Sequence, residues 1–127
     1  MERVMSVEFQ EMRSRLRQAV DALGDAEFQE RLWVRGERRS SSELGFDDTL
    51  LFLVDELEMF DRKELVGAVL TDEAELTAFT SLTVAVEAVI DATGKLGSFQ
   101  DAKAAGVPWA SCVTSARELQ LLLGRDA

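Results

Sequence analysis

The stretch from Thr71 to Gly94 constrains the fold most, because it is the longest run with one helical period and both of its ends are marked. Asp72 is placed to cap the N-terminus, with Glu75 three residues further on, and Gly94 stands where a left-handed residue ends a helix. At about 100° per residue, an apolar stripe faces a polar one. The stripe holds Leu76, Phe79, Leu82, Val86, Val89 and Ile90, and a flank of small residues holds Ala74, Ala78, Ala85 and Ala88. The pattern predicts a long central helix, covered on two sides and solvated on one.

Shorter helical patterns lie on both sides of this stretch. The segment from 64 to 70 fits either a helical turn or a short extended piece, since its apolar period does not decide between them. We therefore predict an all-α fold, a small bundle of five or six helices around the central one, in a single domain over residues 1–127. The other helical segments, marked by caps, glycines or a proline at the start, are 7–23, 26–33, 46–60, 99–105 and 108–123.

Residues 34–45, VRGERRSSSELG, form the most polar stretch and read as a loop. Its arginines, with Arg31, could contact phosphate, but Trp33 is the only aromatic residue beside them, so the nucleic-acid signal is weak. We expect no nucleic-acid partner. The loop is expected either to fold back towards the acidic segment or to stay disordered.

The net charge of −10 is unevenly distributed. Residues 1–39 hold eight basic and eight acidic residues, residues 40–91 hold two and thirteen, and residues 92–127 hold four and three. All of the excess acid therefore lies in the middle third. Such a concentration creates a directional field that repels nucleic acid and anionic lipid and favours a basic partner.

Six carboxylates around the predicted helix over 46–60 are the candidate partner-binding residues. Asp47 and Asp48 lie at the N-terminus of this helix, where the helix dipole favours negative charge. The carboxylates near its C-terminus oppose the dipole and cost stability. Local rules are often broken at functional sites, although Arg62 and Lys63 are an alternative, local compensation. The six residues are Asp47, Asp48, Asp55, Glu56, Glu58 and Asp61.

The residue types present restrict the chemistry. The chain has no histidine, no tyrosine and one cysteine, which excludes catalytic triads, an intrachain disulfide and a zinc site of the usual kind. Cys112 lies on an apolar stripe and is expected to be a buried small hydrophobe. No phosphate-binding glycine loop occurs. We predict no catalytic residue, no cofactor and no metal ligand.

Carboxylate chemistry leaves one enzymatic alternative. The pairs Asp55 with Glu58, Asp72 with Glu75, and Glu87 with Asp91 have helical spacings that could hold Mg²⁺. This resembles the all-helical nucleotide pyrophosphohydrolases, which carry an E-x-x-E pair followed by an E-x-x-D pair. Here Glu27-x-x-Glu30 has no matching later pair. A Mg²⁺-dependent enzyme of this type remains the alternative function.

The N-terminal residues carry charges throughout, and no apolar run reaches the roughly eighteen residues of a membrane span. We therefore expect a soluble, cytoplasmic protein with no membrane partner.

From residue 46 onward the order of elements resembles small acidic bacterial proteins, frequent in actinobacteria, of the immunity-protein-like or uncharacterised type. The matching pieces are Phe46-Asp47-Asp48-Thr49, Asp55-Glu56, Val66-Gly67-Ala68-Val69-Leu70 with Asp72-Glu73, Leu96-Gly97, and Pro108-Trp109. The resemblance implies a binder without chemistry, because immunity proteins work by covering a toxin's active site. An acidic surface suits a cationic nuclease, since complementary charge speeds encounter. The predicted function is a non-catalytic module that binds a basic protein partner, such as a toxin domain; a soluble domain with no charge-directed partner is the other alternative.

Overall fold

The computed structural model describes residues 7–41, 43–57, 60–94 and 98–124, and within them the fold is all-α, as predicted. Seven α-helices and two π-helical segments, labelled η, follow one another in this part of the chain. They are α1 (Gln10–Leu23), α2 (Ala26–Phe28), η1 (Gln29–Val34), α3 (Phe46–Leu51), η2 (Phe52–Glu56), α4 (Arg62–Ala68), α5 (Glu73–Thr93), α6 (Phe99–Ala104) and α7 (Val107–Leu123).

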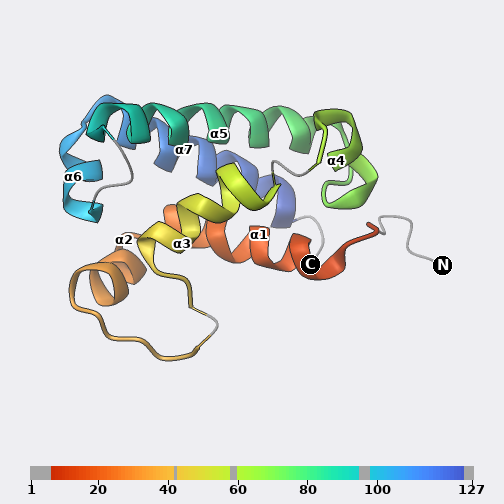
Figure 1. The fold of residues 1–127 in the computed structure, drawn as a ribbon. Helices are drawn as coiled ribbons and strands as arrows, with labels where there is room; N and C mark the ends of the chain where they lie inside the picture. Colours follow the sequence, from red (N-terminus) through yellow and green to blue (C-terminus); the bar gives the residue numbers. More distant parts are fainter. Residues whose placement is uncertain (1–6, 42, 58–59, 95–97, 125–127) are drawn as a thin grey trace.

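The long helices α5 and α7 lie side by side and make the most extensive contact in the fold (Figure 1). Helix α1 packs against α7, and α3 with η2 crosses α1, so that a second layer covers the pair. Helix α6 closes one end of α5 and α4 the other (Figure 1). The core is one cluster of buried apolar side chains drawn from the helices of both layers.

The predicted ends of the central helix are confirmed. The Asp72 carboxylate accepts a hydrogen bond of 3.0 Å from the Glu75 N–H, and Gly94 ends α5 in the left-handed region with φ of 83°. On the predicted stripe Phe79, Leu82, Val86 and Val89 are buried, and Leu76 and Ile90 pack against the core partly buried. Ala78 and Ala85 of the small flank are also buried, whereas Ala74 and Ala88 are exposed.

Three segments depart from regular α-helix geometry. The segment left open between a turn and an extended piece forms most of α4, which is kinked where Gly67 takes a φ of 102° and Val66 leaves the helical region. The predicted helix over 26–33 changes to π geometry at Gln29, and the predicted helix over 46–60 does so at Phe52. The consecutive residues Phe52 and Leu53 are both buried in the core.

A buried ion pair joins α1 to α5, and here a prediction from the sequence is wrong. The sequence pattern over 7–23 aligns Arg13 and Arg17 on the polar outer face of the helix, which predicts a solvated position for Arg13, but the Arg13 side chain is only 4% exposed. Its guanidinium donates to both carboxylate oxygens of Glu75, at 2.8 and 2.9 Å, and to the carbonyl oxygen of Val69 at 3.0 Å. The Thr71 N–H donates a further bond of 2.8 Å to Glu75. The pair therefore fixes α1, the 69–71 connection and the first turn of α5 relative to one another.

The environment keeps Glu75 ionised. Burial of the carboxylate acts to raise the pKa of Glu75, but hydrogen bonds from Arg13 and the Thr71 N–H, together with the Arg13 charge, outweigh burial and hold this pKa below its ordinary value. Removing one partner would leave the other charged and buried, which typically costs about 3 to 5 kcal/mol.

A first prediction tests the buried face of α5. Phe79→Ala or Leu82→Ala should lower the free energy of unfolding by about 2 to 5 kcal/mol, because each leaves a cavity among buried side chains. Glu87→Ala, at an exposed position of the same helix, should cost less than about 0.5 kcal/mol. Denaturant unfolding measures all three, and equal effects would mean that the stripe has been assigned to the wrong side.

A second prediction tests the buried pair. Glu75→Gln should destabilise the fold by about 3 to 5 kcal/mol at neutral pH, and Arg13→Met by a similar amount. Because the folded-state pKa of Glu75 is lowered, the pair's stabilisation is fully present above the unfolded-state pKa and is lost as pH falls through the folded one. The melting temperature should therefore decrease less between pH 7 and acidic pH in Glu75→Gln than in the wild type, because the variant lacks the carboxylate whose protonation breaks the pair.

The matched control is the exposed pair Arg15–Glu56, whose side chains are 42% and 45% exposed. Glu56→Gln should cost no more than about 1 kcal/mol, because solvent screens an exposed pair. If Glu56→Gln and Glu75→Gln lowered the free energy of unfolding equally, the buried pair would have no special structural role.

Candidate interaction site

The outer face of α3 and η2 carries an acidic strip, which we define as Asp47, Asp48, Leu51 and Asp55. All four side chains are exposed, while Phe46, the residue before them, is buried in the core. The spacing of four residues from Asp47 to Leu51 and from Leu51 to Asp55 places them along one side of the helix. The strip thus has an apolar centre, Leu51 with 42% of its surface exposed, between carboxylates at both ends.

The carboxylates of Asp47, Asp48 and Asp55 make no ion pair or hydrogen bond with the residues that the structure describes. Asp47 and Asp48 lie in the first turn of α3, where the helix dipole stabilises negative charge by about 0.3 to 1 kcal/mol each. Their charge is therefore compatible with the helix and available to an external group.

Glu56, at the end of η2, is held by Arg15 of α1. The guanidinium donates to both carboxylate oxygens, at 3.1 and 3.0 Å, and lies 4.6 Å from the centroid of the Phe52 ring. The charge that pairs with Glu56 thus comes from α1. The local compensation by Arg62 and Lys63 that the sequence left open stays a prediction.

A fifth predicted residue, Asp61, does not join the strip. Asp61 is the N-cap residue of α4 and forms a capping box with Glu64. Glu58 lies outside the described residues. Of the six candidates, the structure therefore brings Asp47, Asp48 and Asp55 together on one helix face, with Glu56 paired beside them.

An aromatic groove opens next to the start of the strip. We define it by its floor, Trp33, Phe46 and Phe99, and by the carboxylates Asp47 and Asp48 that also line it. The groove encloses about 680 Å³ and is open to solvent. The three floor rings are mutually packed, with centroids 5.2 to 5.6 Å apart. Its remaining lining residues are Leu32, Gly36, Arg38, Gly45 and Ser98.

The loop after η1 forms the opposite wall of the groove. Arg31 donates to both oxygens of Glu43, at 3.1 and 2.6 Å, and Trp33 Nε1 donates to the Leu44 carbonyl at 3.0 Å. Hydrogen bonds from Arg31 and from the Arg39 backbone N–H lower the pKa of Glu43 to about 2, so the Glu43 carboxylate stays ionised and paired with Arg31 in mild acid. The sequence left two expectations for this loop, folding back towards the acidic segment or disorder. The first agrees with the structure, because Arg38 of the loop and Asp47 of the acidic segment line the same groove.

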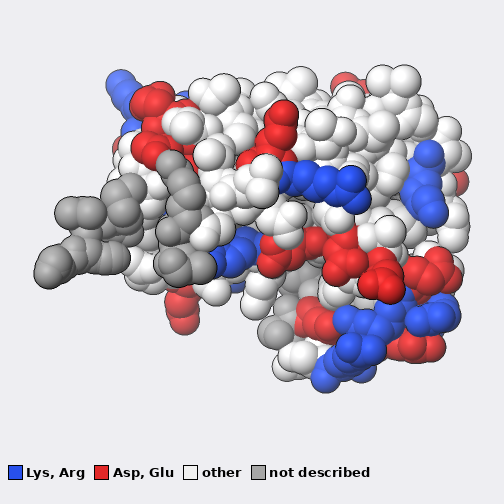
Figure 2. Space-filling view, turned by 180° about the vertical axis from the view of Figure 1, so that it is seen from behind, with Lys and Arg blue, Asp and Glu red and all other residues white. Residues whose placement is uncertain are grey.

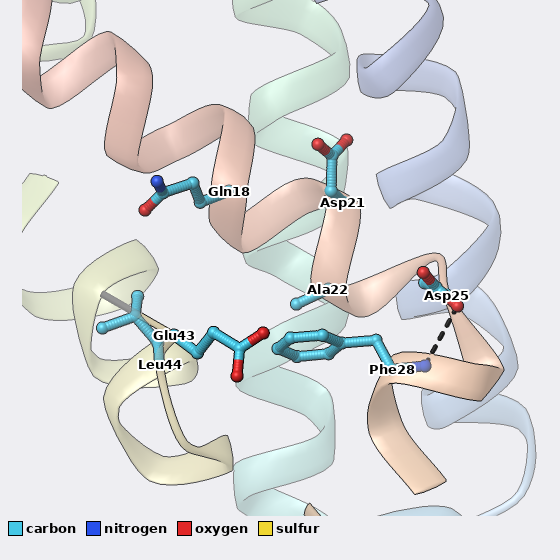
Figure 3. A pocket seen from close by; sticks show the side chains of 7 residues that line it. All are labelled: Gln18, Asp21, Ala22, Asp25, Phe28, Glu43 and Leu44. Carbon is cyan, nitrogen blue, oxygen red and sulfur yellow. Dashed lines mark hydrogen bonds between the residues drawn. The ribbon is translucent and has the colours of Figure 1, made fainter. Parts of the chain in front are cut away.

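A smaller pocket, of about 200 Å³, lies between the end of α1, α2 and the loop (Figure 3). The Phe28 ring and the Glu43 carboxylate point towards each other across it (Figure 3). Its carboxylates are engaged: Gln120 donates to Asp21 at 2.8 Å, and Asp25 accepts from the Phe28 N–H at 3.1 Å. The pocket therefore lies where the loop after η1 meets the end of α1.

Of the carboxylate pairs considered for Mg²⁺, the pair of Asp55 and Glu58 extends outside the described residues. Among the described residues no group of three or more His, Cys, Asp or Glu side chains could hold a metal ion. Within the pair Asp72 and Glu75, the first caps α5 and the second binds Arg13. Cys112 is buried as predicted, and burial raises the pKa of its thiol to about 12.

Charged side chains are unevenly spread over the surface (Figure 2). In the view from behind, they gather at the end that holds α2, η1 and the following loop, while the part over α5 and α7 is mostly uncharged (Figure 2). Of the helices in the described ranges, α5 alone is long and apolar enough to cross a membrane by length and composition, with a mean hydropathy of 1.3. Its apolar stripe is part of the core, and core helices pass the same test.

These features define a small all-α protein with a buried ion pair between its layers and an acidic strip beside an aromatic groove. The chain belongs to a family described as a domain of unknown function, DUF7945, whose model matches residues 7–127. No curated protein matches the chain. No solved structure matches it either.

The sequence pattern missed Leu51 and the groove. In the sequence, Leu51 and Phe52 add apolar surface beside the stripe of the helix over 46–60, which predicts that this helix is nearly as buried as the central one, but Leu51 is exposed and the change to π geometry after it was not predicted. The groove brings together residues up to sixty-seven positions apart, from Leu32 to Phe99, which no local period connects. The one available signal was composition, because the aromatic residues Trp33 and Phe46 directly flank the polar loop.

A third prediction addresses the enzymatic alternative. Titration with Mg²⁺ or Mn²⁺ should leave the melting temperature unchanged, because a cation that does not bind the folded state selectively does not stabilise it. Scanning calorimetry in buffers of equal ionic strength measures this. A saturable rise that Glu58→Gln abolishes would overturn the prediction and favour the pyrophosphohydrolase-like alternative.

Proposed function

We propose that this protein is a non-catalytic interaction module whose acidic strip binds a basic protein partner. The observation that carries the proposal is an exposed leucine, Leu51, flanked by carboxylates that have no partner among the described residues. An apolar contact surrounded by polar groups has the anatomy of a protein interface. Immunity-protein-like action on a toxin domain in the cytoplasm is the form of this function that the sequence resemblance supports.

Charge supports a basic partner for two reasons. The segment from 40 to 91 carries eleven more acidic than basic residues, and the strip lies within it. Opposite charge on a partner would speed encounter and disfavour wrong partners, and the effect would weaken as salt rises. Leu51 would then contribute affinity that salt does not screen.

The anchoring of the strip also supports the proposal. The pair between Arg15 and Glu56 attaches the end of η2 to α1, and Phe46 attaches the start of α3 to the core. A surface that is fixed before binding loses little conformational entropy on association, which favours affinity.

The fourth prediction is a capture experiment at low salt from the native host, with bound proteins identified by mass spectrometry. The triple variant Asp47→Asn, Asp48→Asn, Asp55→Asn should lose basic proteins that the wild type retains, because the strip loses its charge. Leu51→Ser should reduce capture of the same proteins, also at higher salt.

The matched control removes three exposed carboxylates from α5: Glu73→Gln, Glu87→Gln and Asp91→Asn. It changes the net charge by the same amount and should retain the partner. If wild type, strip variant and control capture the same proteins with the same salt dependence, the strip is only a solvated face and the proposal fails.

A further inference from the structure

Twice within this molecule an arginine is held by a ring and a carboxylate together. Arg15 lies 4.6 Å from the centroid of Phe52 while it donates to both oxygens of Glu56. Arg31 lies 5.4 Å from the centroid of Phe28 while it donates to both oxygens of Glu43. The guanidinium suits this arrangement because it is planar, stacks on aromatic faces and matches a carboxylate with two parallel hydrogen bonds.

The aromatic groove presents the same two parts without a bound arginine. Its floor offers the partly exposed ring of Trp33, supported from below by the buried rings of Phe46 and Phe99, and its lining also holds Asp47 and Asp48, whose carboxylates have no partner among the described residues. A floor ring already accepts a cation from inside the chain, since Lys103 Nζ lies 5.2 Å from the centroid of Phe99. The groove volume of about 680 Å³ leaves room for a long side chain and part of the backbone that carries it.

We infer that the aromatic groove receives an arginine side chain of the basic partner, stacked on the partly exposed Trp33 ring and hydrogen-bonded to Asp47 and Asp48. The inference rests on the proposed function and names the group that the partner inserts. The groove is continuous with the acidic strip because the two share Asp47 and Asp48, so one basic segment with an arginine at its end can contact both.

Two cations of the chain itself border the groove and oppose this binding. Arg38 lines the opposite wall and donates to the Glu43 carbonyl, and Lys103 reaches the floor from α6. Removing the charge at Arg38 should therefore strengthen the binding of an external arginine, whereas a groove that recognised anions would be weakened by the same change.

The fifth prediction uses a short peptide with one arginine between glycines and its counterpart with neutral, nearly isosteric citrulline. Calorimetry measures affinity, and two-dimensional NMR follows the indole N–H signals of Trp33 and Trp109. The arginine peptide should bind and shift the Trp33 signal more than that of Trp109, and the citrulline peptide should bind at least about tenfold more weakly because it lacks the charge. Arg38→Gln should tighten binding of the arginine peptide.

Matched variants separate the groove from general charge. Asp47→Asn with Asp48→Asn should weaken binding of the arginine peptide about tenfold or more, while Asp55→Asn with Glu56→Gln, an equal charge change, should leave it within about threefold. Gly45→Gln blocks the groove without changing charge, because Gly45 has an ordinary φ of −68° and an added Cβ there meets no atom within 4 Å. It should weaken binding as strongly as the Asp47 and Asp48 pair, and melting temperatures verify that each variant is folded.

The outcomes separate this inference from the proposed function. Equal binding of the citrulline peptide, equal weakening by the two double variants, undiminished binding to Gly45→Gln, or no detectable binding would each overturn the groove assignment. Loss of partner capture by the strip variant would still support the proposed function in those cases. Selective arginine binding with partner capture unaffected by the strip variant would instead refute the proposed function.

Discussion

The buried pair of Arg13 and Glu75 is the interaction on which the arrangement of the helices depends. Both side chains are almost fully removed from solvent, and each makes further hydrogen bonds to the backbone of the 69–71 connection. Because desolvated charges are costly unless nearly every donor and acceptor is satisfied, only one placement of α1 against α5 keeps the pair stable. Apolar contacts alone would allow neighbouring registers, since methyl groups are interchangeable at similar volume. The ion pair thus selects one packing of the two layers.

The fixed position of α1 determines where its other arginines point. Alternate residues reach three different parts of the fold: Arg13 binds α5, Arg15 binds Glu56 of η2, and Arg17 donates to the Leu123 carbonyl at the end of α7 at 3.0 Å. Within five consecutive residues, α1 thereby makes hydrogen bonds to α5, η2 and α7. The exposed pair of Arg15 and Glu56 adds to the burial of Phe52 and Leu53 in the core, and together these contacts position η2 and the acidic strip.

Features that depend on near neighbours could be predicted from the sequence, and features that depend on distant contacts could not. The caps at Asp72 and Gly94 and the buried stripe through Phe79 and Leu82 follow from residues within one helix, and all were predicted. Arg13 and Glu75 are sixty-two positions apart, so the helical period could place Arg13 only on a polar face and not beside a buried carboxylate. Geometry within a helix can also depend on packing. The change to π geometry at Phe52 has no marker in the sequence, since no glycine or proline stands there.

The engagement of the arginines inside the fold also explains why the acidic strip retains its field. Residues 1–39 hold as many basic as acidic residues, so their arginines would be expected to neutralise the nearby carboxylates of the acidic strip. However, the charge of Arg13 is compensated within the core, and Arg15 and Arg31 are each paired with a carboxylate of their own. Asp47, Asp48 and Asp55 lie outside these pairs. The fold therefore pairs these arginines internally, and the carboxylates on the face of α3 and η2 that exposes Leu51 keep a negative charge that a basic partner would compensate.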